Sequence, residues 1–123
     1  MEQGAALFFV RAVVADPQER PRFDEWYRSE HLPEALAALR PARAWRSWSR
    51  TDACVHFAFY AFPSLAAAQA ALRSEAMQVL IVKFDEAWGA RVARDRTILE
   101  VSQALTAADG SEAAPRALGL SAP

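Results

Sequence analysis

Residues 54–62, CVHFAFYAF, constrain the fold more than any other stretch, because a strand with this composition is apolar on both of its faces. The stretch 5–15 alternates in the same way, with apolar side chains in both of its alternating sets. An antiparallel sheet with one face in water shows a clean alternation of apolar and polar residues, which is absent here. Both faces of the predicted sheet must therefore be covered.

The predicted strands and helices follow one another in the order β-α-β-β-α-β. Strands are expected over 5–15, 42–51, 54–62 and 96–105. This order is the split βαβ, or ferredoxin-like, arrangement of an α+β domain, with a four-stranded antiparallel sheet, both helical regions on one face and the last strand beside the first. Since no third helix remains to bury the other face of the sheet, the simplest way to bury it is the sheet of a second copy, and we expect a homodimer.

Local signals mark where the helices begin and end. Asp16 followed by a proline is a typical start for the first helical region. Ser64 is a natural N-cap for the second region, Ser74 can cap a further segment within it, and Gly89 is suited to its end. We expect one domain over residues 1–105 and a mobile tail over 106–123, where Ala, Gly, Ser and Pro show no pattern.

Composition excludes several classes of protein. The 123 residues have the length of one domain, and a formal net charge of −1 does not favour nucleic-acid binding, which normally requires a basic excess on one face. The lone cysteine and two histidines form neither a disulfide nor a zinc signature, so no metal site is expected. No apolar run approaches the ~18 residues of a membrane span, and no signal-peptide pattern begins the chain, so a cytoplasmic protein without membrane contact is expected.

The stretch 23–33, FDEWYRSEHLP, combines aromatic and titratable residues on one helix. Helical spacing places on one side of this helix the residues Phe23, Trp26, Tyr27, Glu30 and His31. Pro33 is expected to end the helix, to push Leu32 out of the α region and to leave His31 near a helix C-terminus, with a second short helix following. An aromatic wall beside a titratable pair suits a small-molecule pocket, although a core helix with a polar end has the same pattern.

Three segments together resemble the dimeric α/β-barrel superfamily, and within it the EthD-like group. These segments are FDEWYRSEHLPE, SLAAAQAALRSEAMQVL and RTILEV, and the resemblance covers roughly residues 5–105. It implies a homodimer whose two sheets pack into a barrel. It also implies one of several activities, which include polyketide cyclisation, lactone isomerisation, cofactor-free oxygenation and haem degradation. The fold by itself therefore does not settle the chemistry.

His31 is the first candidate catalytic residue. It matches the histidine of the His-x-Pro motif in the family that the chain resembles, and an imidazole with an ordinary pKa near ~6.5 is suited to proton transfer. The alternative is a structural histidine that bonds a terminal carbonyl or Glu30 at the helix end. Glu30 itself is expected to be solvated.

His56 and Tyr60 are the other candidate catalytic residues, four positions apart on one face of a predicted strand. If Val55, Phe57 and Phe59 face the helices, His56 and Tyr60 point into the barrel. There they can serve as base and oxyanion donor for enolate chemistry. The alternative is a hydrogen-bonded pair at a dimer interface.

Four further residues are candidate ligand contacts. Trp26 and Tyr27 form the aromatic wall, and Trp48 lies on the opposite strand face from Trp45, so that one of the two lines the barrel or the partner. Arg11 lies within an otherwise apolar strand and needs either a bound anion or a carboxylate, for which Glu100 on the last strand is the preferred partner.

Two functional hypotheses follow. The first is a cofactor-free acid–base enzyme of the cyclase, isomerase or oxygenase type, acting on a small, largely apolar or aromatic compound. The second is a non-catalytic dimeric protein that binds a hydrophobic ligand or assists a neighbouring enzyme. Haem degradation fits less well, because the similar proteins with that activity place a haem-ligating histidine on the second long helix, and residues 64–88 contain none.

Overall fold

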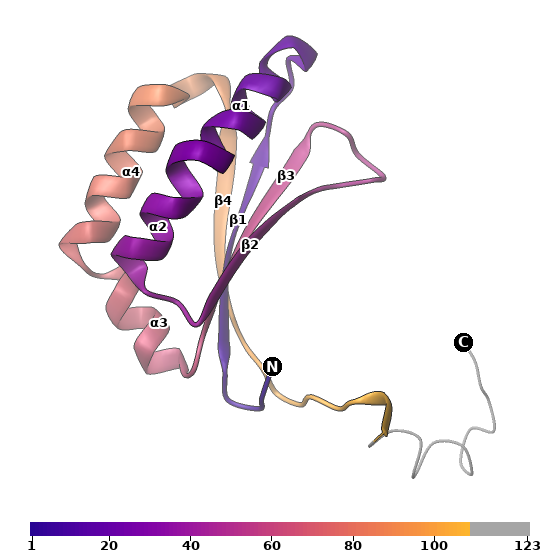
Figure 1. The fold of residues 1–123 in the computed structure, drawn as a ribbon, viewed down its shortest axis with the longest axis vertical. Helices are drawn as coiled ribbons and strands as arrows, with labels where there is room; N and C mark the ends of the chain where they lie inside the picture. The colour runs from indigo at the N-terminus through magenta and orange to yellow at the C-terminus, as the bar shows by residue number, and fades with distance from the viewer. Residues whose placement is uncertain (109–123) are drawn as a thin grey trace.

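A four-stranded antiparallel sheet forms one layer of the protein, and helices form the other (Figure 1). The computed structural model describes residues 1–108, so most of the expected tail lies outside the described residues. The strands lie side by side in the order β2-β3-β1-β4. They are β1 (Ala6–Val13), β2 (Arg43–Trp48), β3 (Val55–Phe62) and β4 (Ala93–Glu100). The predicted ferredoxin-like topology, with the last strand beside the first, is confirmed.

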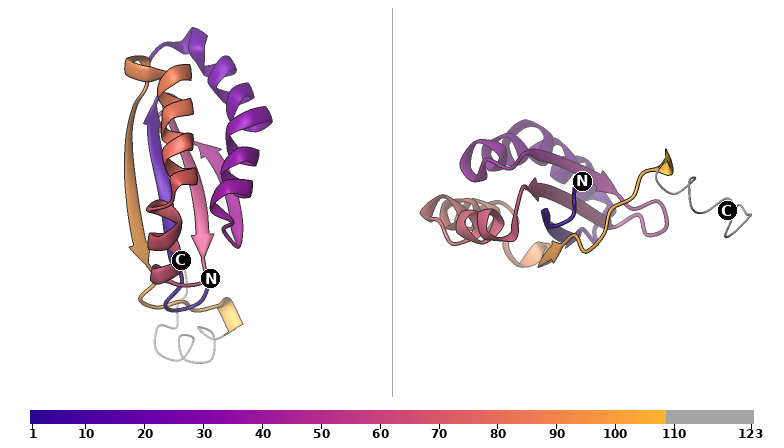
Figure 2. Two further views of the ribbon diagram at one scale, coloured as in Figure 1. Left: turned by 90° about the vertical axis from the view of Figure 1, so that its left-hand side faces the viewer. Right: turned by 90° about the horizontal axis from the view of Figure 1, so that it is seen from below.

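All the helices cover the same face of the sheet, as the two views of Figure 2 also show. The first helical region consists of η1 (Pro17–Glu19), α1 (Arg20–Trp26), η2 (Tyr27–His31) and α2 (Leu32–Leu39). The second consists of α3 (Leu65–Leu72), α4 (Glu75–Ala87) and η3 (Gly89–Arg91). Apolar side chains from both layers meet in one core, whose largest members include Phe8, Phe23, Tyr27, Tyr60, Phe84 and Trp88.

The predicted serine caps are present. The hydroxyl of Ser64 accepts a hydrogen bond from the backbone N–H of Ala67 at 3.1 Å. The hydroxyl of Ser74 accepts one from Met77 at 3.2 Å, which separates α3 from α4 at the position where the sequence predicts a break. Each cap provides an acceptor for an N–H group that has no partner inside its own helix.

The helix does not end at Pro33, so that expectation was wrong. The chain widens into a single π turn over Tyr27–His31, in which the N–H of Leu32 donates to the carbonyl of Tyr27, and Leu32 stays in the right-handed α region. Proline lacks an N–H and its ring collides with the carbonyl four residues earlier, and a widened turn relieves this collision without breaking the helix. His31 therefore lies in the middle of a continuous helical region.

The faces of β3 are the reverse of the arrangement that would point His56 and Tyr60 into a barrel. His56, Ala58 and Tyr60 lie opposite Ala12, Val10 and Phe8 of β1, and these side chains pack beneath the helices. Phe57 and Phe59 point to the other face of the sheet, where both contact the ring of Phe9. Because both faces of the strand are apolar, periodicity could not tell them apart.

The face of the sheet away from the helices carries a cluster of four aromatic side chains, which we call the open-face cluster: Phe9, Trp45, Phe57 and Phe59. The rings of Trp45 and Phe59 stack at 5.1 Å, and those of Phe57 and Phe59 at 5.8 Å. Trp48 lies on the opposite face, as the odd spacing from Trp45 predicts.

The last strand begins three residues earlier than predicted, and the residue opposite Arg11 in the sheet differs from the expected one. Its pairing with β1 runs from Ala93 to Glu100, which places Asp95 opposite Arg11 and Glu100 opposite Ala6, near the far end of the strand. The expected Arg11–Glu100 ion pair was therefore wrong. The charged residues at 94–96 are not typical of a buried strand, so the sequence did not indicate that the strand begins before them. This strand lies at an edge of the sheet, where charged residues are common.

Among residues 1–108, no helix is both long and apolar enough to cross a membrane. Within the same range, no group of three or more His, Cys, Asp or Glu side chains is arranged to hold a metal ion.

Candidate functional site

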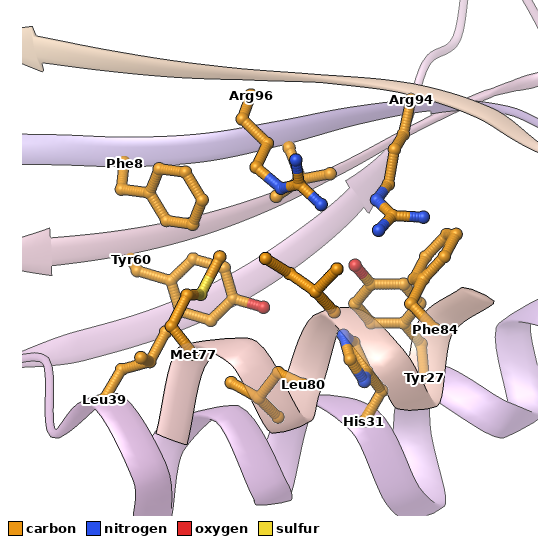
Figure 3. Close-up of a pocket in the computed structure, with 12 residues that line it drawn as sticks. Phe8, Tyr27, His31, Leu39, Tyr60, Met77, Leu80, Phe84, Arg94 and Arg96 are labelled. Carbon is orange, nitrogen blue, oxygen red and sulfur yellow. The ribbon is translucent and has the colours of Figure 1, made fainter. Parts of the chain in front are cut away.

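A small cavity lies between the helices and the sheet, and most of its lining is apolar (Figure 3). Its volume is about 30 Å³, enough for one or two water molecules. The apolar lining consists of Phe8, Val10, Leu39, Met77, Leu80, Ile81 and Phe84. The other lining residues are all polar or titratable: Tyr27, His31, Tyr60, Arg94 and Arg96. A few polar groups in an apolar cavity are typical of a small-molecule site.

His31 lines this cavity from the π turn and is enclosed by aromatic rings. Its imidazole stacks on Trp26 with ring centroids 4.4 Å apart and an interplanar angle of 15°, and it meets the edges of Tyr27 at 5.0 Å and Phe84 at 5.8 Å. Residues five apart in an ordinary α-helix point about 140° away from each other, so only the widened turn allows Trp26 and His31 to stack.

The imidazole of His31 is neutral at pH 7. The residue is 7% exposed, and its Nδ1 is buried without a hydrogen-bond partner among residues 1–108. Burial lowers the pKa of His31 to about 4, nearby Arg94 and Lys83 lower it further, and Glu34 opposes them. Buried polar atoms in native proteins are almost always paired, so this nitrogen needs a partner that the described residues do not supply, as do Nδ1 of His56 and Nε1 of Trp88.

Two phenols lie next to the imidazole. Tyr27 and Tyr60 are each almost fully buried, and Tyr60 stacks on Phe8 at 5.6 Å. Burial is the main reason that the pKa of each phenol is raised well above its ordinary value. Both therefore remain protonated at neutral pH. A hydrogen bond between the two hydroxyl groups lowers the pKa of Tyr27 and raises that of Tyr60, as expected when Tyr60 donates to Tyr27. The O–H of Tyr27 is then the donor that remains for an oxygen atom in the cavity.

Two arginines line the cavity from β4, and the sequence analysis missed both. Arg94 donates to Asp85 at 3.0 Å and places its guanidinium 3.9 Å from the ring centroid of Phe84. Arg96 has no ion pair with any described residue, and burial and the neighbouring Arg94 lower its pKa. Arg94 and Arg96 are two positions apart, so a strand predicted to begin at Ala93 would have placed both side chains on the same face of the sheet.

His56 lies outside the cavity, in a separate cluster that fixes α1 to the sheet. It is fully buried, with ring centroids 4.9 Å from Trp48 and 4.6 Å from Tyr27, and its Nε2 lies 3.4 Å from Arg46. Asp24 on α1 accepts hydrogen bonds from Arg46 at 2.7 Å and from Trp48 at 2.8 Å. Burial lowers the pKa of His56 to about 4, so this imidazole is also neutral at pH 7.

The structure thus brings together some of the predicted site residues and separates the rest. His31, Tyr27 and Tyr60 line one cavity, and Trp26 supports it by stacking on His31. Tyr27 also contacts both histidines and so separates the cavity from the cluster that holds His56 and Trp48. Arg11 lies on the opposite face of the sheet, since its neighbours in register are Phe57 and Asp95.

Solved structures of similar fold exist, although no protein-family model and no curated protein matches the sequence. SnoaB from Streptomyces nogalater, a cofactor-independent oxygenase, is 14% identical, with a TM-score of 0.61 over 83% of this chain and 97% of its own. An EthD family protein from Bacillus halodurans is also 14% identical, with a TM-score of 0.56 over 74% of this chain and 96% of its own. The ferredoxin-like fold of this chain is therefore shared with SnoaB and with an EthD family protein. At this level of identity the likeness shows the fold alone.

A NIPSNAP family protein of unknown function from Agrobacterium tumefaciens has the same fold. It is 12% identical, with a TM-score of 0.61 over 84% of this chain and 96% of its own. One fold therefore occurs in an oxygenase and in proteins without an assigned reaction, and the chemistry of this chain has to be argued from its own cavity.

A second hollow of about 300 Å³ adjoins the cavity and opens beside β4. It shares four lining residues with the cavity: Phe8, Met77, Ile81 and Arg96. Because the same side chains border both spaces, movement of the flexible thioether of Met77 and the long side chain of Arg96 would join them. Together the spaces reach the lower end of the volumes typical of small-molecule sites, ~300–1,000 Å³.

Proposed function

We propose that this protein is a cofactor-free acid–base enzyme that removes a proton from carbon in a small, largely apolar or aromatic compound. The observation that carries the proposal is the buried, neutral imidazole of His31, with Nδ1 unpaired within the described chain, in an apolar cavity that also contains two protonated phenols. These groups provide a base and an oxyanion donor, which are the parts that enolate chemistry needs.

The proton transfer uses residues that line the same cavity. A ring nitrogen of His31 takes the proton from a carbon next to a carbonyl group, and the electron pair of the broken C–H bond moves into an enolate. The enolate oxygen accepts a hydrogen bond from Tyr27, whose own oxygen accepts one from Tyr60. The new anion stabilises the imidazolium, so the pKa of His31 rises from its resting value as the transfer proceeds. The same imidazolium can return the proton to another atom of the intermediate.

This step is common to the cyclase, isomerase and cofactor-free oxygenase types of reaction, because each can begin with a carbanion or enolate. SnoaB, whose fold this chain shares, is a cofactor-independent oxygenase, and this supports the proposal without naming a substrate. His56 is proposed to be structural, since it lies behind Tyr27 and does not line the cavity.

We also infer that a second copy of the chain covers the open-face cluster. All four aromatic side chains are partly exposed on one sheet face, and a contiguous apolar patch of this kind is typical of an interaction surface. A homodimer buries this surface symmetrically, and it leaves the cavity of each protomer on the outer, helical side of its own sheet.

Proton exchange with solvent tests the proposed reaction without knowledge of the natural substrate. Aryl ketones and aryl keto acids are incubated with the protein in D₂O, and ¹H NMR follows the loss of the proton next to the carbonyl group. The wild-type protein should accelerate exchange for at least one compound, and His31→Gln should slow this exchange by about 100-fold or more.

Glu30→Gln is the matched control, because Glu30 precedes His31 and is exposed, and its rate should equal that of the wild type. If His31→Gln remains folded and exchanges at the wild-type rate, His31 is not the base. Binding of the compounds without any exchange would favour the alternative, a non-catalytic ligand-binding protein.

A further inference from the structure

We propose that Arg96, with Arg94 beside it, forms a carboxylate-binding subsite, so that the ligand of this cavity is a monoanion with an apolar or aromatic body. The inference deepens the proposed function by naming a substrate class, and it concerns residues to which no role in proton transfer is assigned. It rests on geometry at the wall that β4 contributes to the cavity.

Both guanidinium groups extend from the same face of β4 toward the helices. Arg94 lies opposite Ala12 and Arg96 opposite Val10, whose side chains are buried beneath the helices. Figure 3 shows the two side chains next to each other, directed toward the phenols of Tyr27 and Tyr60. The side chain of Arg94 is largely buried, whereas Arg96 is exposed where the strand borders the adjoining hollow. The two neighbouring cations repel each other, and a bound anion removes that repulsion.

The carboxylate that already lies nearby neutralises only one of the two cations. Asp85 accepts a hydrogen bond from Arg94, and the side chain of Arg94 is only 12% exposed. Arg96 is attracted by the same Asp85 but makes no ion pair with any residue from 1 to 108, and the imidazole of His31 is neutral. These four groups therefore leave one net positive charge at the cavity, which matches a ligand with one negative charge.

A carboxylate is the anion that this arrangement suits best. Guanidinium groups bind carboxylates through two parallel hydrogen bonds, and the phenol of Tyr27 provides a further donor. The rest of the lining is apolar, chiefly Leu39, Met77, Leu80, Ile81 and Phe84, so it favours a hydrocarbon body over a second charged group. A dianion such as a phosphate monoester would leave one charge uncompensated in this apolar space.

The position of Arg96 also indicates how such a ligand is oriented. Arg96 lines both the cavity and the adjoining hollow beside β4, whereas His31 lines only the cavity. A carboxylate held at Arg96 therefore lies where the two spaces meet, and the carbon to be deprotonated can reach inward toward His31.

A pair of probes with the same body tests the subsite: 3-phenylpropionate and its uncharged analogue 3-phenylpropanamide. Each is titrated into ¹⁵N-labelled protein, and the dissociation constant is taken from the shifts of backbone amide signals around β4 and α4. The wild-type protein should bind the carboxylate about ten-fold or more tightly than the amide, because charge-assisted hydrogen bonds are stronger than neutral ones.

Arg96→Gln should reduce this preference to about two-fold or less, and Arg96→Lys should give an intermediate value because it keeps the charge but loses the planar fork. Arg50→Gln is the matched control, since it removes the same charge from an exposed position in the loop between β2 and β3 and should keep the wild-type preference. The ¹⁵N spectra also show whether each variant is folded.

Equal binding of the two probes by the wild type, no binding of the carboxylate, or an unchanged preference in a folded Arg96→Gln protein would each overturn the subsite. The His31→Gln variant separates this proposal from the proposed function. If that variant exchanges protons normally while Arg96→Gln loses the carboxylate preference, the subsite stands and the assignment of the base fails.

Discussion

Lowering the pH from about 7.5 to about 5 should destabilise the protein through its two buried histidines. Burial lowers the pKa of His31 and of His56 from 6.5 to about 4. In the window between these values the unfolded chain binds protons that the folded chain excludes. Stability is therefore greatest above pH 6.5 and falls as the pH drops toward 4.

The magnitude follows from the two pKa values. At about pH 5 an unfolded histidine is almost fully protonated and the buried one is largely neutral, which costs about 2 kcal/mol for each histidine and about 4 kcal/mol for both. The carboxyl groups whose pKa is lowered by hydrogen bonds, Asp24 foremost, lose their contribution mainly below this window. The loss between pH 7.5 and 5 is thus assigned to the histidines.

Urea unfolding at the two pH values measures this loss, at one fixed protein concentration because the apparent stability of the inferred dimer would depend on concentration. His31→Gln and His56→Gln should each retain about half of the wild-type difference between the two pH values, about 2 kcal/mol, whatever their stability at pH 7.5. Since the chain has only two histidines, their ring proton signals are easily assigned, and these signals should not titrate above about pH 5 in the folded protein.

A wild-type loss below about 1 kcal/mol, or ring signals that titrate near pH 6.5, would refute the reasoning, because either result means that the imidazoles are not held neutral by burial.

Two further predictions concern the surface and the helices. Phe59→Asp places a charge in the open-face cluster and should convert a dimer into monomer or aggregate, whereas a soluble dimer by native mass spectrometry would contradict the inferred interface. Ser74→Ala removes the acceptor for the Met77 N–H and should cost about 1 kcal/mol, a fall of about 4 °C in Tm by calorimetry. Ser29→Ala is the matched control, because the exposed hydroxyl of Ser29 bonds only to Glu25, one turn earlier in the same helical region. It should leave the Tm nearly unchanged, so equal falls in the two variants would rule out a specific capping effect.

The candidate site was only partly predictable from the sequence, and the reason lies in the range of the interactions. The aromatic helix, His31 and Tyr27 are close in sequence, so helical spacing was enough to place them together. Arg94 and Arg96 join them only through the pairing of β4 with β1, and no local signal specifies that register.

Two interpretations of the sequence were wrong because tertiary packing outweighed the local preference of the chain. Pro33 was expected to end a helix, because proline disfavours the helical conformation of its neighbours. Instead a π turn relieves the collision between the proline ring and the preceding helical turn. The buried side chains of Phe23, Tyr27 and His31 continue to pack against the sheet. The sequence left open which face of its strand His56 occupies, and the arrangement in which His56 faces away from the helices is wrong. A strand that is apolar on both sides does not show by its pattern which side meets the helices.

The sequence by itself determined the order of the elements, the serine caps and the two apolar faces of the sheet, because each depends on neighbours within a few positions of the chain. Only the tertiary structure decided which face of β3 meets the helices and which charged residues reach the cavity. Those choices depend on the fit of whole layers, in which small residues such as Ala58 make room for the rings of α1, and such fit involves residues far apart in the chain.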